Sequence, residues 1–225
     1  RDGRKDDIIW LWPKLQPQQP WTEVKHDPDP NLCVWKTINV WGTKFRRFGP
    51  DGNGEAVELP LENLENWKTY VQPSLPTAEN YDTQAIKNHP DKYLLGVMGT
   101  AGSLFEGAHQ IRGLADWLTD FYENPDFVRE VLDMLVERTL RVIDLLADMG
   151  VDGVMGYDDW GIQDRPLMGM ELWNEFYRPR YQKIWDYAHS KGLDVWMHSC
   201  GYTLPILKAW AEIGLNVAQL DQQQN

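Results

Sequence analysis

The sequence predicts an α/β protein made of parallel βα units, and it favours a (β/α)8 TIM barrel over a doubly wound sheet. From about residue 92 onward, short apolar runs alternate with helical patterns, and the helices are followed by Gly150, Gly192 and Gly214. Polar residues follow successive strands at the same end. In a barrel such strand ends converge on one mouth. Only about half of the units of a full barrel are recognisable, so we expect the barrel to be incomplete in this chain.

The first 80 residues have a different character. They are rich in proline between positions 13 and 30, and the runs 34–41 and 44–48, with Gly42 and Thr43 between them, predict an antiparallel hairpin. A further turn is expected at 49–54, where Gly and Asn tolerate positive φ. We therefore assign residues 1–80 to an N-terminal appendage of the same domain, and 81–225 to the barrel portion.

The elements of the barrel portion follow in order. Strands are expected at 93–98, 151–157, 193–197 and 216–220. Helices are expected from Asn124 and Pro125 to about 149, from 170 to about 191, and over 204–213. The run Val195, Trp196 and Met197 resembles a strand that is buried on both faces.

Composition limits the possible partners. The chain has 225 residues, a net charge of −12 and no cluster of Lys or Arg, which argues against nucleic acid or an anionic membrane surface and favours a small-molecule substrate. Two cysteines are too few for a disulfide framework, and no apolar run approaches the roughly 20 residues that span a bilayer. We expect a cytoplasmic protein whose natural sequence continues beyond both ends.

We interpret most of the 12 tryptophans as packing residues rather than as a substrate surface.

His198 and Cys200 form the first candidate site. Side chains two residues apart at a strand end point the same way, so an imidazole and a thiolate can bind one ion, and zinc accepts both. The residues alone fit a core histidine and a buried thiol equally well, and a metal site needs a third ligand. Asp158, Asp159, Asp221 or a residue beyond Asn225 can serve, whereas Cys33 in the appendage is a poor candidate.

The second candidate site is the segment 157–163. We predict a functional role for Asp158 and Asp159, which can hold a substrate, orient a metal-bound histidine or act as a catalytic general acid. Capping of a helix that begins near 170 explains little. Trp160 and Gln163 are expected to bind substrate. Gln219, at the end of the strand expected at 216–220, is expected to bind it too. Arg112 is expected to bind a substrate carboxylate, although a surface salt bridge is the commoner role for such a residue.

Several motifs resemble those of the uroporphyrinogen decarboxylase superfamily, and they occur in the same order as in that superfamily. They are residues 99–113, the run Asp158-Asp159-Trp160-Gly161-x-Gln163, the helix 172–179, the run His198-Ser199-Cys200-Gly201, and Trp41-Gly42-Thr43 with Pro60-Leu61. The resemblance covers nearly the whole chain. It implies a (β/α)8 barrel of the uroporphyrinogen decarboxylase type.

The resemblance also implies a choice between two chemistries. The corrinoid-linked methyltransferase branch uses zinc held by His-x-Cys and a distant third Cys, which would lie past Asn225; His198 and Cys200 match the first two ligands. The resemblance thus implies zinc-assisted methyl transfer between a corrinoid protein and a small donor or acceptor, with Asp159 in support. The decarboxylases of tetrapyrrole biosynthesis instead use basic residues, an Asp and a Tyr. The segment 96–113 contains no Tyr. A non-catalytic partner of a corrinoid protein is a third possibility.

Overall fold

The computed structural model describes residues 7–14, 19–25, 34–48 and 54–222. The chain divides into two compact units, each with its own sheet. The first unit comprises Arg1–Lys14, Leu75–Gly107 and Asn124–Asn225, and the second comprises Leu15–Ser74 and Ala108–Glu123.

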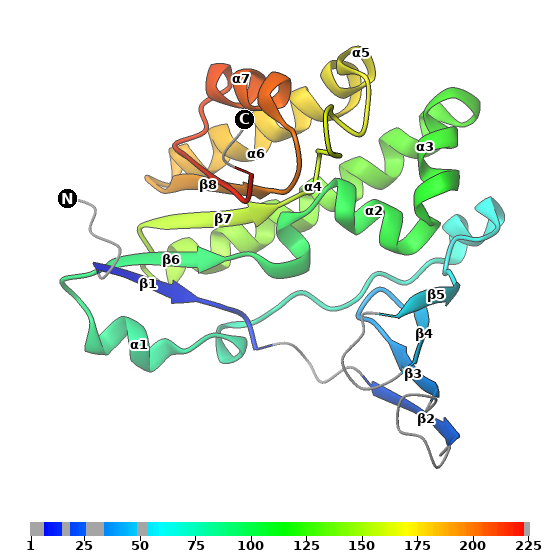
Figure 1. Ribbon diagram of the computed structural model, residues 1–225. Helices are drawn as coiled ribbons and strands as arrows, with labels where there is room; N and C mark the ends of the chain where they lie inside the picture. The colour runs from blue at the N-terminus through cyan, green and yellow to red at the C-terminus, as the bar shows by residue number, and fades with distance from the viewer. Residues whose placement is uncertain (1–6, 15–18, 26–33, 49–53, 223–225) are drawn as a thin grey trace. The chain divides into compact units, whose positions relative to one another are not determined.

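The first unit contains a five-stranded parallel sheet (Figure 1). The strands lie in the order β1 (Ile8–Leu11), β6 (Tyr93–Val97), β7 (Gly153–Tyr157), β8 (Asp194–Ser199) and β9 (Val217–Leu220). The expected parallel α/β architecture is therefore confirmed, as are the four strands that the sequence predicts. Strand β1 was not expected. It comes from the segment assigned to the appendage, yet it pairs with β6 in register from Ile8 and Tyr93 onward.

Helices connect these strands. They are α1 (Thr83–Asn88), α2 (Phe105–Arg112), α4 (Pro125–Asp148), α5 (Met170–Leu172), α6 (Arg178–Ser190) and α7 (Leu204–Glu212), with 3-10 turns at Ala78–Asn80 and Gly99–Gly102. Helix α4 packs against α6. It also packs against β6, where a Cβ atom on Gly96 would lie 2.8 Å from the Leu146 side chain. The predicted helices at 124–149 and 204–213 are confirmed.

The helix predicted at 170–191 is present but interrupted. Residues Trp173–Tyr177 form a π-helical turn between α5 and α6. Pro179 lies immediately after this turn, in the first turn of α6, and it has no N–H to donate to the preceding turn.

Strand β8 is not buried on both faces, which corrects the sequence-based expectation. Val195, Met197 and Ser199 are buried, whereas Trp196 and His198 on the opposite face are only half-buried. Because side chains alternate along a strand, this pattern places His198 on the more open face of the sheet.

Tryptophans contribute strongly to the core of the first unit. Trp160, Trp173, Trp185 and Trp210 are fully buried and in aromatic contact with neighbouring rings. The packing interpretation therefore holds for these residues. It does not hold for Trp10 and Trp12 on and after β1, which are 38% and 59% exposed.

The second unit contains an antiparallel sheet of β2 (Gln19–Lys25), β3 (Val34–Ile38), β4 (Lys44–Phe48) and β5 (Glu55–Glu58) in that order. The predicted hairpin is β3–β4, and its turn is stabilised by the Asn39 side chain, which accepts from the N–H groups of Trp41 and Thr43. The turn expected at 49–54 lies largely outside the described residues, as does Cys33. The unit also contains the 3-10 turn Leu64–Thr69 and helix α3 (Leu114–Glu123).

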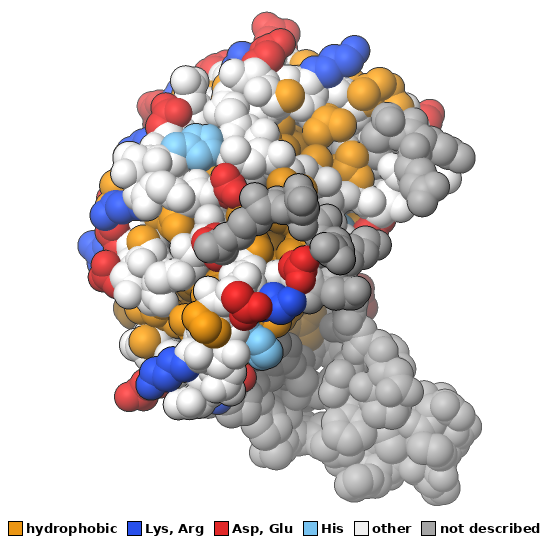
Figure 2. All heavy atoms as spheres, turned by 90° about the vertical axis from the view of Figure 1, so that its left-hand side faces the viewer, with side chains coloured by type: hydrophobic (Ala, Val, Ile, Leu, Met, Phe, Trp, Pro, Cys, Tyr) orange, Lys and Arg blue, Asp and Glu red, His pale blue; other side chains and the backbone are white. Residues whose placement is uncertain are grey.

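Charge on the surface matches the acidic composition. On the described part of the face in Figure 2, Lys and Arg side chains lie singly among Asp and Glu and form no basic patch. Among the described residues, none of the helices has the length and apolar character that a membrane span requires.

Candidate functional site at the strand ends

Two glycines bring the loops after β7 and β8 together. The N–H of Gly161 donates to the Cys200 carbonyl over 3.0 Å, and the N–H of Tyr202 donates to the Ile162 carbonyl over 2.9 Å. A Cβ atom on Gly201 would lie 2.2 Å from the Gly161 carbonyl oxygen, and Gly201 has a φ of +76°. Only glycine fits both the backbone angle and this close approach. The two motifs that the sequence singled out therefore meet at one place.

This contact assembles a cluster of three potential metal ligands. Oxygen, nitrogen and sulfur atoms of Asp159, His198 and Cys200 all lie within 4.8 Å of one another. The His198 Nε2 atom is 3.3 Å from the Cys200 sulfur and 3.6 Å from Asp159 Oδ1. Asp159 also accepts from the backbone N–H of Cys200 over 2.9 Å, which fixes the carboxylate beside the thiol.

Asp221, which follows β9, adds a second carboxylate to the cluster. Its Oδ2 atom lies 3.2 Å from the Cys200 sulfur. Burial, and then the carboxylates of Asp221 and Asp159, raise the pKa of the Cys200 thiol to about 12. The thiol is thus held protonated by its own surroundings. A cation bound by these atoms would instead lower the pKa of the thiol and favour the thiolate.

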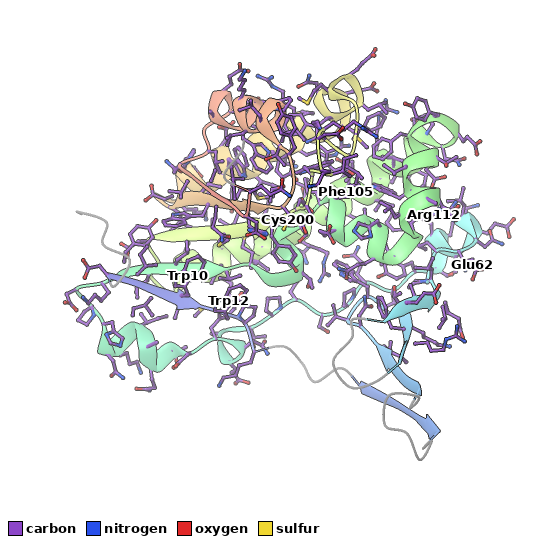
Figure 3. The ribbon with its side chains drawn as sticks, in the orientation of Figure 1. Trp10, Trp12, Glu62, Phe105, Arg112 and Cys200 are labelled. Atoms are coloured by element: carbon purple, nitrogen blue, oxygen red, sulfur yellow. The ribbon has the colours of Figure 1, made fainter. Side chains whose placement is uncertain are left out.

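A cavity of about 490 Å³ adjoins the cluster on the more open face of the sheet. The described part of its lining is mainly apolar and includes no Lys or Arg; it consists of Trp10, Trp12, Val97, Met155, Tyr157, His198 and Gln219. Figure 3 labels Trp10 and Trp12, whose rings lie 6.3 Å apart and nearly parallel. Gln219, expected to bind substrate, is in this lining and lies beside His198, with 2.7 Å between Oε1 and Nδ1.

Asp158 has a different environment from Asp159. It is completely buried, and burial raises the pKa of its carboxyl group to about 7. Its two oxygens accept from the N–H groups of Leu104 and Glu106 at the start of α2, over 2.8 and 2.7 Å, and Tyr181 donates its hydroxyl to Oδ2. Asp158 therefore caps a helix that precedes it in the sequence, rather than the one that follows it. Its catalytic role remains a prediction.

The other predicted substrate-binding residues lie outside this cavity. Trp160 is fully buried against Phe105 and Tyr177, and its indole N–H donates to Tyr181 over 3.1 Å. Gln163 is exposed on the loop after Trp160. Substrate binding by either residue remains a prediction, and in the structure Trp160 is a core residue.

Arg112 lies in the second unit and is 8% exposed. Its guanidinium donates to Asp120 over 2.7 Å and to the carbonyls of Leu61 and Glu62 over 2.8 and 2.9 Å (Figure 3). These contacts join α2, α3 and the segment after β5. Arg112 is therefore buried among protein acceptors and is not a surface residue, and substrate binding by Arg112 remains a prediction.

Sequence reasoning missed several residues of the site. Trp10 and Trp12 precede any recognisable βα repeat, and Val97 and Met155 are indistinguishable in the sequence from core residues. Their common feature is register: Val97 pairs with Met155, and His198 pairs with both Tyr157 and Gln219, so these side chains share one face of the sheet. Strand pairing reveals that face, and single-strand patterns do not.

Comparisons with known proteins identify one family and a solved structure of similar fold. The family model described as uroporphyrinogen decarboxylase (URO-D) matches residues 48–225. No curated protein sequence matches. Among solved structures, a methyltransferase from Methanosarcina mazei is similar, with a TM-score of 0.57 and 19% identity over 80% of this chain. The chain covers 52% of that structure, or about half its length.

Proposed function

The chain belongs to the uroporphyrinogen decarboxylase family, and from this premise we propose that it acts in methyl transfer between a corrinoid protein and a small methyl donor or acceptor. His198 and Cys200 would hold a zinc ion, with Asp159 in support. The observation that carries the proposal is the approach of Asp159, His198 and Cys200 to within 4.8 Å of one another at the strand ends.

The donor set fits zinc. Zinc binds imidazole nitrogen, thiolate sulfur and carboxylate oxygen, and a site with three protein ligands leaves one position for a substrate. Asp221 supplies a further carboxylate beside the thiol, so more than one oxygen donor is available. When bound, zinc supplies the Lewis acidity that holds a thiol as thiolate or polarises an ether oxygen.

The protein side chains have separate tasks in this proposal. Asp159 fixes the backbone of Cys200 through the N–H that it accepts, so the sulfur and the imidazole stay on the same side of the strand end. The apolar cavity beside the cluster offers its aromatic walls to a small molecule. The methyl donor or acceptor would occupy this cavity next to His198.

Tetrapyrrole decarboxylation is the second candidate, because the matching family model carries that description. A porphyrinogen with many carboxylates needs basic side chains to bind it. The described residues that line the cavity include no Lys or Arg, and two carboxylates lie beside Cys200. The electrostatics thus favour methyl transfer. Turnover of uroporphyrinogen without added metal is the assay that would favour the decarboxylase instead.

Metal analysis of the purified chain tests the proposal. We expect close to one zinc per chain after loading and dialysis, and strong loss of zinc in both His198→Ala and Cys200→Ser. His89→Ala, which changes a histidine outside the cluster, should retain zinc. Unchanged zinc content in the two cluster variants would rule out the site. A corrinoid methyl-transfer assay on zinc-loaded protein then tests the reaction itself.

A further inference from the structure

Gln219 lies directly opposite His198 in the sheet. The two residues pair in register between the parallel strands β8 and β9, and both line the same cavity. The distance between His198 Nδ1 and Gln219 Oε1 is 2.7 Å, a short and direct hydrogen bond. The other ring nitrogen, Nε2, faces Cys200 and Asp159.

An amide oxygen only accepts hydrogen bonds, whereas a neutral imidazole carries a proton on just one of its two nitrogens. The structure places the amide oxygen against Nδ1, and with the oxygen there a neutral ring carries its proton on Nδ1. The lone pair is then on Nε2. It points toward the sulfur at 3.3 Å and the carboxylate at 3.6 Å, where a metal ion would be bound.

We propose that Gln219 is a positioning residue that holds His198 in the Nδ1–H tautomer and so presents Nε2 as the ligand atom. The inference rests on the proposed function, and it assigns Gln219 a role other than direct substrate binding. Metal-bound histidines commonly donate their second N–H to an oxygen that fixes the ring orientation. Here the acceptor comes from the neighbouring strand.

A neutral acceptor suits this site better than a charged one. Asp159 and Asp221 already place two carboxylates beside Cys200. A third carboxylate at position 219 would keep the hydrogen bond, and it would also favour the imidazolium form, which cannot bind metal. Glutamine fixes the tautomer without adding charge.

The test measures the tautomer directly in the metal-free chain, by long-range proton–nitrogen NMR correlations of the neutral His198 ring. We expect Nδ1–H in the unmodified protein and in Gln219→Glu. In Gln219→Leu we expect the Nε2–H form to predominate and zinc affinity to fall about 10- to 100-fold. Gln84→Leu, which changes an exposed glutamine on α1, is the matched control and should alter neither quantity.

An Nε2–H tautomer in the unmodified chain would overturn the inference, because Gln219 would then donate through its amide nitrogen. An unchanged tautomer and zinc affinity in Gln219→Leu would also overturn it. Gln219 is exposed, so circular dichroism should show that all three variants fold. The tautomer is measured without zinc, so the two proposals can fail separately. If Gln219→Leu changes the tautomer but the unmodified chain binds no zinc, only the proposed function is overturned.

Discussion

The adjacent carboxylates Asp158 and Asp159 illustrate how burial separates two identical side chains. Asp159 is half-buried and faces His198 and Cys200, whereas Asp158 points into the core and caps α2. The sequence predicted catalytic roles for both residues. It gave no means of distinguishing them, because the helix that Asp158 caps lies about fifty residues earlier in the chain.

We predict that Asp158→Asn lowers the free energy of unfolding by about 2 kcal/mol. Each carboxylate oxygen accepts from a backbone N–H, so an amide nitrogen in either position faces a donor and leaves it unsatisfied. Urea unfolding measures the loss. Asp164→Asn, at an exposed position, is the control and should stay within about 0.5 kcal/mol of the unmodified protein. Equal stability of the two variants would contradict the capping role.

At the scale of elements, the site depends on the contact between the loops that follow β7 and β8. Gly201 and Gly192 have almost the same φ, +76° and +77°, but only Gly201 is packed against another backbone segment. A Cβ atom on Gly192 would meet nothing within 4 Å. Substitutions at Gly192 and Gly201 therefore separate the effect of backbone conformation on stability from the effect of close packing.

We expect Gly192→Ala to cost about 1–2 kcal/mol, the usual cost of a left-handed conformation for an L-residue. Gly201→Ala should cost at least about 2 kcal/mol more, because its methyl group would overlap the Gly161 backbone. It should also weaken zinc binding, since this contact holds the two ligand-bearing loops together. Thermal or urea unfolding and zinc titration of both variants provide the measurements. A similar stability loss in both would show that the loop contact is unimportant.

The sequence predicted those elements whose signal is local. Pro125 and the apolar spacing predicted α4, and the residues His198 and Cys200 were correctly expected to lie close together. The signal for β1 was too weak, because Ile8–Leu11 is only four residues long and lies in an irregular segment. The cavity was missed for a different reason. Its lining comes from strands far apart in the sequence, and their common face follows from register.

On the scale of the whole molecule, burial of tyrosine hydroxyls makes stability sensitive to alkaline pH. Burial raises the pKa of Tyr81, Tyr93 and Tyr181 above the ordinary value of 10, with Asp194 contributing at Tyr93 and Asp158 at Tyr181. Below pH 10 these groups are protonated in both the folded and unfolded states. Above pH 10 the unfolded state loses protons that the folded state keeps, so stability decreases as the pH rises.

We predict that these three tyrosines and Tyr157, whose pKa burial also raises, do not ionise until the protein unfolds in alkali. Phenolate absorbance should therefore increase in two stages, and the second stage should coincide with loss of the circular dichroism signal. Ionisation of all nine tyrosines near pH 10 with an intact dichroism spectrum would contradict the burial that the structure describes.

The central claim is that His198 and Cys200 bind zinc together in a protein of this family. X-ray absorption spectroscopy of the zinc-loaded chain tests it most directly, because it identifies the ligand atoms. We predict one sulfur at about 2.3 Å and imidazole nitrogen at about 2.0 Å, with oxygen completing the shell. The sulfur should disappear in Cys200→Ser and the imidazole in His198→Ala. A zinc shell without sulfur in the unmodified chain would contradict the account.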